Sequence, residues 1–139
     1  MTSRVLVPMN GSEMAEKALE FALETYSDAE ITVLNVIGVP SWHMGDAAGL
    51  ALSGDLSEAT ETQTEIVFEP ARELAATHNT EIKTIIGVGS PSQTITKRAE
   101  DFDIVVIGNH GSDLSSRLLI GNVAATVTRR SPIPVTVVG

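Results

Sequence analysis

Five short runs of apolar residues, many of them β-branched, recur along this chain. They are VLVPM, ITVLNVI, IKTIIGV, DIVVIG and IPVTVV, at residues 5–9, 31–37, 82–88, 103–108 and 133–138. Several are continuously apolar and lack the alternation of a strand with one solvated face, which is typical of strands covered on both faces. Each run therefore predicts a buried strand of a parallel sheet.

Between these runs the apolar positions recur at helical spacing. The segment after the first run predicts a helix that either Asn10 or Ser12 can cap. Its expected apolar face is Met14, Ala18, Phe21, Ala22 and Thr25. The glutamates of the same segment are spaced as a solvated face rather than as paired catalytic carboxylates: Glu13, Glu16, Glu20 and Glu24.

Two further helices have clear start or stop signals. Ser90 before Pro91 predicts a helix start, with an apolar face of Ile95, Ala99 and Phe102. The segment from 121 to 131 predicts a last helix that places Val123, Ala124 and Val127 together. Arg129 and Arg130 end that helix, where cations interact well with its dipole.

The predicted elements alternate as β-α-β-α-β-α-β-α-β within one domain, residues 1–139. Crossovers of this length require a parallel sheet with helices on both faces, so we expect an open α/β fold of five parallel strands. The second crossover differs from the others because residues 38–55 form a variable loop rich in Gly, Ala and Ser. The helix that follows, at about 56–78, contains Pro70, which should kink or interrupt it.

Composition narrows the function classes. The 139 residues are 42% hydrophobic and 19% charged, which is typical of a globular protein. The formal net charge of −9, with only nine basic residues, argues against a nucleic-acid-binding surface. The acidic, lysine-poor composition suits a high-salt cytoplasm, although an ordinary acidic cytosolic protein is the alternative. No apolar run is long enough to span a membrane, and the absence of cysteine fits a reducing cytoplasmic location.

Unusual residues follow two of the predicted strands, and in an open α/β sheet ligands bind at the carboxyl ends of the strands. Pro8, Asn10, Gly11 and Ser12 lie at or just after the end of the first strand, whereas Gly108 and Gly111 lie at or just after the end of the fourth. Gly121 and Asn122 then open the last helix, whose free N–H groups attract an anion. Glycines of this kind indicate a backbone phosphate cradle, with a long flexible loop as the alternative.

The pattern Gly-x-x-Gly, nine residues, Gly, a small polar residue and Val resembles the nucleotide-binding signature of the universal stress protein (UspA-like) family. The resemblance extends over nearly the whole chain, from RVLVPMNGSEMAEKALEFAL to SPIPVTVV. It implies a Rossmann-like fold of the adenine nucleotide alpha hydrolase type with strand order 3-2-1-4-5. It also implies a homodimer through the last strand, 133–138, and, in one branch of the family, bound ATP or AMP.

The resemblance also assigns roles to individual residues. It implies that Pro8 and Asn10 lie by the ribose and adenine, and that the backbone of Val36 meets the adenine edge. The residues implied to surround or follow the phosphates are Gly108, Gly111, Gly121, Asn122 and Val123. This chain has Asn10 where the family usually has Asp, and Asn122 where it usually has Ser or Thr. Asn122 can still donate to a phosphate, whereas Asn10 lacks the negative charge that would strengthen ribose or metal contacts.

The function that these features favour is a nucleotide-binding regulatory module of the stress response, a homodimer without catalysis. A slow ATP hydrolase or phosphotransferase using His110 or Ser112 is one alternative, although no residue beside His110 in the sequence would orient it as a base. A dimeric scaffold with an empty nucleotide site is the other. We expect no dedicated metal site, because no His/Asp/Glu cluster has metal-ligand spacing, while Mg²⁺ accompanying the nucleotide stays open.

Overall fold

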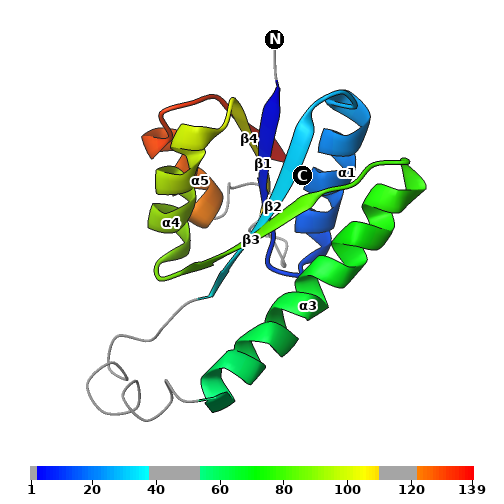
Figure 1. The fold of residues 1–139 in the computed structure, drawn as a ribbon. Helices are drawn as coiled ribbons and strands as arrows, with labels where there is room; N and C mark the ends of the chain where they lie inside the picture. The colour runs from blue at the N-terminus through cyan, green and yellow to red at the C-terminus, as the bar shows by residue number, and fades with distance from the viewer. Residues whose placement is uncertain (1–2, 38–53, 110–121) are drawn as a thin grey trace.

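One parallel sheet forms the centre of the molecule (Figure 1). The computed structural model describes residues 3–37, 54–109 and 122–139. Its strands are, in chain order, β1 (Arg4–Pro8), β2 (Glu30–Ile37), β3 (Lys83–Val88), β4 (Ile104–Gly108) and β5 (Val135–Val138). All neighbours pair in parallel, in the order β3-β2-β1-β4-β5. The predicted sheet and its strand order are confirmed, and β1 and β4 lie side by side at its centre.

In the described part of the chain, two helices cover each face of the sheet (Figure 1). They are α1 (Glu13–Thr25) and α3 (Gly54–Thr77) on one face, and α4 (Pro91–Arg98) and α5 (Asn122–Arg130) on the other. A 3₁₀ turn, η2 (Ala99–Asp101), follows α4. Side chains of β1 alternate between the two layers, so that Val5 and Val7 pack under α1 and α3, whereas Leu6 packs under α4 and α5. This double coverage explains why the strands are apolar without alternation.

The buried face of α1 differs in part from the predicted one. Ala18 and Ala22 are buried as expected, but Met14 and Phe21 are only half-buried and Thr25 is exposed. The face that packs on the sheet is Ala15, Ala18, Leu19, Ala22 and Leu23. The prediction missed it by about one position, because this helix also carries apolar residues at the margins of its buried stripe. Its four glutamates are exposed, as the solvated-face interpretation required.

Helix α3 is continuous through Pro70. Of the two expected effects of this proline, the interruption is therefore wrong, and the kink stays a prediction. Pro70 has no N–H to donate to the carbonyl of Ile66. Ile66 is 66% exposed, so water can reach that side of the helix. On the opposite side, buried Phe68 and Ala71 hold the helix on the core at the same turn. Packing of this kind offsets the intrinsic cost of a proline inside a helix.

On the second face of the sheet, the predicted start of α4 and the predicted end of α5 are confirmed. Ser90 is the N-cap of α4 with Pro91 as its first residue. Ile95, Ala99 and Phe102 are all buried there, as predicted. Ala124 and Val127 are buried and Val123 is half-buried on α5, whose last turn carries both arginines.

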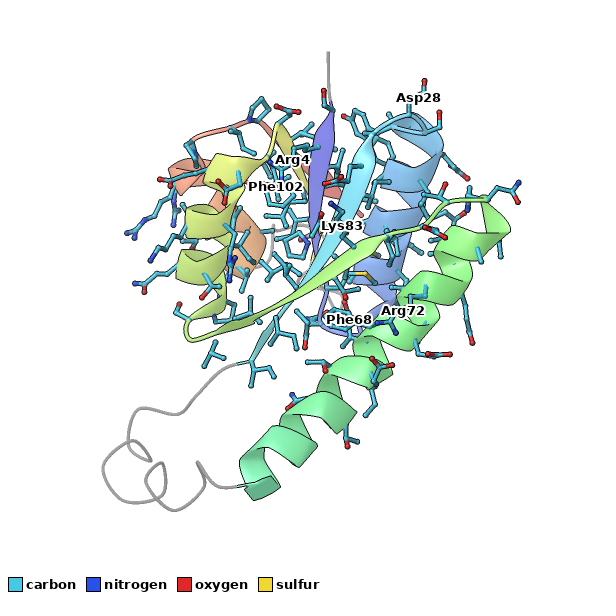
Figure 2. The ribbon with its side chains drawn as sticks, viewed as in Figure 1. Arg4, Asp28, Phe68, Arg72, Lys83 and Phe102 are labelled. Atoms are coloured by element: carbon cyan, nitrogen blue, oxygen red, sulfur yellow. The ribbon has the colours of Figure 1, made fainter. Side chains whose placement is uncertain are left out.

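A cluster of polar contacts ties the amino ends of the central strands together. The carboxylate of Asp103, just before β4, accepts hydrogen bonds from the N–H groups of Ser3 and Arg4, both at 2.9 Å. The Arg4 guanidinium lies over the ring of Phe102, 5.0 Å from its centroid (Figure 2). These contacts therefore lie at the amino ends of the strands, on the opposite side of the sheet from their carboxyl ends.

Among the helices within residues 3–37, 54–109 and 122–139, none has the length and apolar character needed to cross a membrane.

Candidate functional site

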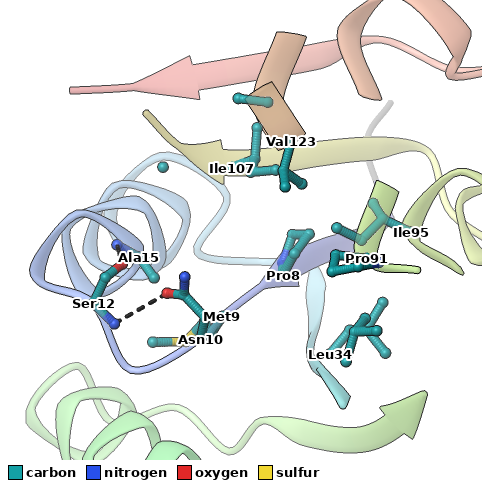
Figure 3. Close-up of a pocket in the computed structure, with 13 residues that line it drawn as sticks. Pro8, Met9, Asn10, Ser12, Ala15, Leu34, Pro91, Ile95, Ile107 and Val123 are labelled. Atoms are coloured by element: carbon teal, nitrogen blue, oxygen red, sulfur yellow. Dashed lines mark hydrogen bonds between the residues drawn. The ribbon is translucent and has the colours of Figure 1, made fainter. Parts of the chain in front are cut away.

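A pocket with a volume of about 230 Å³ lies at the carboxyl ends of β1, β2 and β4 (Figure 3). Residues of all three strands, and of the starts of three helices, contribute to its wall. The described lining residues are Pro8, Met9, Asn10, Ser12, Ala15, Leu34, Val36, Pro91, Ile95, Ile107, Gly108, Val123 and Ala124. The site is therefore at the position where open α/β sheets bind ligands, beside the central strands.

The turn between β1 and α1 forms the polar wall of this pocket. Gly11 has φ of 85°, a left-handed conformation that lets the chain reverse between Asn10 and Ser12. Across this turn the N–H of Ser12 donates to the Asn10 side-chain oxygen at 3.1 Å (Figure 3). The Ser12 hydroxyl then accepts from the N–H of Ala15 at 3.2 Å and caps α1. Of the two predicted caps, Ser12 is the helix cap, and Asn10 orders the turn before it.

Three helices direct their N-terminal turns at the pocket. Ser12 and Ala15 belong to the cap and first turn of α1, Pro91 is the first residue of α4, and Val123 lies in the first turn of α5. The first turn of a helix carries the positive end of the helix dipole and backbone N–H groups without a partner inside the helix. In α1 the N–H of Ala15 is taken by the Ser12 cap, and in α4 Pro91 has no N–H. The described lining residues include no charged side chain. The chemistry available from these residues is thus apolar contact, two short polar side chains and the backbone.

Gly108 ends β4 where α1 crosses it. A methyl group at this position would lie 2.5 Å from the carbonyl oxygen of Met14 and 3.0 Å from the N–H nitrogen of Ala15. The glycines with positive φ in the described part of the chain are Gly11, Gly89 and Gly139, so Gly108 does not serve a left-handed turn. The glycine is required here because the α1 backbone approaches it closely.

The structure brings five of the eight predicted site residues to one pocket. These are Pro8, Asn10, Val36, Gly108 and Val123. Asn122, which was expected to open the last helix beside the phosphates, is the exposed first residue of α5 and is not part of the described pocket wall. Gly111 and Gly121 lie outside the described residues, as do His110 and Ser112 of the hydrolase alternative.

The sequence analysis missed most of the apolar wall. The omitted apolar lining residues are Met9, Ala15, Leu34, Pro91, Ile95, Ile107 and Ala124. Pro91 and Ile95 had a usable signal, because the Ser90-Pro91 helix start follows the third strand and so falls at the same edge of the sheet. Leu34 and Ile107 had none, since apolar residues within strands are indistinguishable in the sequence from core residues.

The described lining residues of this pocket include no titratable side chain. Asp103, whose pKa is held below its ordinary value by the N–H groups of Ser3 and Arg4, lies at the opposite edge of the sheet. His78 follows the end of α3, where its Nδ1 lies 3.2 Å from the carbonyl of Leu74 and its Nε2 lies 3.9 Å from Glu24. The described residues contain no group of three or more His, Asp or Glu side chains arranged to hold a metal ion.

The comparisons with known proteins decide the family. The model of the universal stress protein family matches residues 1–139. The chain belongs to the universal stress protein family. Among curated relatives, universal stress protein MJ0577 of Methanocaldococcus jannaschii is 32% identical over 158 residues, which cover 99% of this chain and 95% of that protein.

Solved structures of universal stress proteins share the fold. A structure of MJ0577 superposes with a TM-score of 0.74 at 30% identity, covering 99% of this chain and 96% of the other. A universal stress protein crystallised in complex with cAMP has a TM-score of 0.69 at 24% identity, covering 99% and 97%. The Archaeoglobus fulgidus universal stress protein in complex with dAMP has a TM-score of 0.67 at 22% identity, covering 100% and 98%.

Proposed function

We propose that this universal stress protein binds an adenine nucleotide, AMP or ATP, in the pocket at the carboxyl ends of β1, β2 and β4. Occupancy of the pocket would set the conformation or partner choice of a homodimeric, cytoplasmic regulatory module in the stress response. The observation that carries the proposal is that one pocket gathers Pro8, Asn10, Val36, Gly108 and Val123. These are five of the residues to which the resemblance to the family assigns a place beside the nucleotide.

The chemistry of the wall suits the parts of an adenine nucleotide. Leu34, Val36 and Ile107 offer an apolar surface on which a purine ring can be buried. Asn10 and Ser12 supply short polar groups on the opposite side of the pocket (Figure 3). The first turns of α1 and α5 attract the phosphate through their N–H groups and dipoles. Family members solved with cAMP and dAMP support the choice of an adenine nucleotide.

The described wall favours binding over catalysis. Hydrolysis of a phosphoanhydride needs a general base or metal that positions the attacking water. The described lining residues offer an amide, a hydroxyl that already accepts a hydrogen bond, and apolar groups. We therefore propose a regulatory binding site rather than an ATPase. Mg²⁺ would enter only with the nucleotide, held by its phosphates.

Isothermal titration calorimetry with AMP, ADP, ATP and cAMP, with and without Mg²⁺ and in high salt, tests this proposal. We expect saturable binding of at least one adenine nucleotide and much weaker binding of CMP, whose smaller base buries less area. No heat from any adenine nucleotide at millimolar concentration would overturn the proposal and favour a scaffold with an empty site. Phosphate release from ATP above the buffer rate would instead favour the hydrolase.

A pocket-filling substitution locates the binding site. Val123→Trp places an indole in the pocket, because Val123 is half-buried and lines it. Ala125→Trp on the same helix is the matched control, since Ala125 is half-buried as well but is not part of the pocket wall. We expect the first variant to lose nucleotide binding and the second to keep it. Equal binding by both variants would place the nucleotide elsewhere.

We further propose that the homodimer forms through β5, the edge strand next to β4. At the two ends of this pair, the N–H groups of Val105 and Asn109 donate to the carbonyls of Pro134 and Val138. Bonded residues alternate along a parallel ladder, so the backbone groups of Val135 and Val137 face away from β4. An edge strand with free backbone groups is a ready interface for a second copy related by a two-fold axis.

A further inference from the structure

Asn35 is a polar residue in the middle of the apolar strand β2. It is 4% exposed, and its side-chain Nδ2 donates to the carbonyl oxygen of Met9 at 2.9 Å. Within the described residues, its Oδ1 has no hydrogen-bond partner. Burial of an unpaired acceptor is unfavourable, so this amide does not resemble a residue that serves the core alone. Its one described hydrogen bond holds Met9, the residue at which the chain leaves the sheet toward the pocket.

The hydrogen bond from the Asn35 side chain to Met9 takes the place of one backbone hydrogen bond between β1 and β2. Glu30 donates to the carbonyl of Ser3 at the start of the β1–β2 pair, and Met9 donates to the carbonyl of Leu34 at its end, at 2.8 Å in both cases. Because hydrogen-bonded residues alternate along a parallel strand pair, the next hydrogen bond of the β1–β2 pair would be donated by the Val36 N–H to the Met9 carbonyl. The Asn35 side chain is the donor to that carbonyl instead.

We propose that Asn35 is a positioning residue of the nucleotide pocket. Its side-chain amide occupies the Met9 carbonyl oxygen, which would otherwise accept a hydrogen bond from the Val36 N–H in the strand ladder. The Val36 N–H is then available to a ligand. Val36 and Met9 both line the pocket, whereas Asn35 lies behind its wall. The inference rests on the proposed function only in naming a nucleotide as the group that the Val36 N–H serves.

The same hydrogen bond fixes the polar wall of the site. Met9 is 3% exposed and precedes Asn10, whose side chain receives the N–H of Ser12. Ser12 in turn caps α1. Asn35 is therefore linked to the first turn of α1 by successive contacts. It binds Met9, the next residue Asn10 accepts from Ser12, and Ser12 caps the helix. Loss of the Asn35 donor would let β1 continue to pair with β2 and would move this turn.

Amide hydrogen exchange in the nucleotide-free protein tests the positioning role directly. We expect Asn35→Leu, which keeps the size but lacks the donor, to slow exchange of the Val36 amide at least tenfold relative to Ile37. Ile37 is the internal reference because its backbone faces β3, where its carbonyl accepts from Gly89 at 2.9 Å. Asn35→His, which offers a ring N–H at a similar distance from the backbone, should retain fast exchange at Val36. Unchanged relative exchange in Asn35→Leu would overturn the proposal.

Calorimetry with AMP tests the consequence for the pocket. Asn35→Leu should bind AMP at least tenfold more weakly, and Asn35→His should restore the affinity to within threefold. Val33→Ala is the control for lost core packing, because Val33 is fully buried on the same face of β2 and is not part of the pocket wall. It should lower the unfolding temperature without changing the AMP affinity more than twofold. Parental AMP affinity in Asn35→Leu would overturn the proposal.

The two experiments separate this inference from the proposed function. If the parent protein binds no adenine nucleotide, the proposed function fails, and the exchange of Val36 still decides the role of Asn35. If Asn35→Leu does not fold, Asn35→Thr takes its place, because threonine suits a strand and its hydroxyl is too close to the backbone to reach Met9. The same relative exchange of Val36 then supports or overturns the proposal.

Discussion

Gly108 lies against the backbone of Met14, where β4 passes beneath the first turn of α1. A side-chain carbon at Gly108 would lie 2.5 Å from the Met14 carbonyl oxygen. Backbone of a helix cannot move aside as a side-chain end can, so this contact makes glycine necessary whether or not a phosphate is bound. The family signature and the packing of the fold thus require the same residue for separate reasons.

We expect Gly108→Ala to destabilise the nucleotide-free protein. The added methyl group must push α1 away from β4, and overpacking of this kind costs about 1–3 kcal/mol. Urea unfolding without nucleotide measures the loss. Gly87→Ala is the matched control, since its methyl group would meet the side-chain methyl of Thr94 at 2.6 Å, which can rotate away. A stability loss no larger for Gly108→Ala than for Gly87→Ala would show that the close approach does not constrain this strand.

We expect Asn10→Asp to raise nucleotide affinity about threefold or more, because a charged acceptor binds ribose hydroxyls more strongly than an amide does. The Asp side chain can keep the hydrogen bond from the Ser12 N–H. It also places a negative charge near the N-terminus of α1, which stabilises the helix by about 0.3–1 kcal/mol. Calorimetry with adenosine and with AMP measures the effect. The gain should be larger for adenosine, since the new charge repels a phosphate, and no gain for either ligand would remove Asn10 from the ribose contacts.

We expect Val137→Pro to give a monomer. Proline removes the outward N–H of an edge strand while the ladder to β4, which uses the backbone of Thr136 and Val138, stays intact. Size-exclusion chromatography with light scattering reports the mass. Val137→Ala is the control, because it loses the same side-chain packing and retains the N–H. A dimer of unchanged stability in the proline variant would exclude pairing through β5.

Asp103 predicts a dependence of stability on pH. Hydrogen bonds from the backbone of Ser3 and then Arg4 lower its pKa from the ordinary value of 3.8. The folded state therefore favours the carboxylate, so this group stabilises the protein above pH 3.8, and the contribution is lost as the pH falls through the lowered value. We expect Asp103→Asn to be less stable at neutral pH and to approach the parent protein as the pH falls through the lowered pKa of Asp103. Thermal unfolding of both proteins from pH 2 to 7 measures the difference, and a constant difference across that range would contradict the assignment.

The net charge of −9 predicts stabilisation by salt. Raising KCl from 0.1 M to 1 M shortens the screening length from about 10 Å to about 3 Å and weakens repulsion among surface carboxylates. The unfolding temperature should therefore rise with KCl. Glu20→Lys with Glu73→Lys is the control at two exposed positions, since each change replaces a negative charge by a positive one and the net charge becomes −5. A salt response as large in this variant as in the parent would point to general salting-out instead of charge screening.

The sheet and the residues at the carboxyl ends of its strands were predicted well from the sequence, because the sequence signals there are local and mutually consistent. Five apolar runs separated by helical patterns leave few topologies open. The Ser90-Pro91 start of α4 needs no tertiary information, since the fixed φ of proline and the N-cap preference act within two residues. The same is true of the polar wall, where Asn10 and Ser12 were both recognised as cap candidates.

Features that depend on contacts between distant segments were not predictable. The close approach of Gly108 to Met14 joins residues 94 positions apart in the chain, and a glycine in the sequence does not reveal which backbone approaches it. At Asn35 the sequence contained a signal that was not interpreted. A lone amide within the run ITVLNVI is unusual, but only the structure shows that its partner is the Met9 carbonyl. Pro70 failed as a helix breaker because the buried residues around it outweigh the local preference.

The opposite placement of the Asp103 contacts and the pocket has a practical consequence for labelling the protein. Ser3 is held at the amino edge of the sheet, the full length of β1 away from the pocket. Gly139 instead lies beside Met14 and Asn109, next to the strand proposed to form the dimer. A fluorophore attached at Ser3 is therefore expected to leave binding and assembly undisturbed, whereas one attached at Gly139 is expected to interfere with assembly.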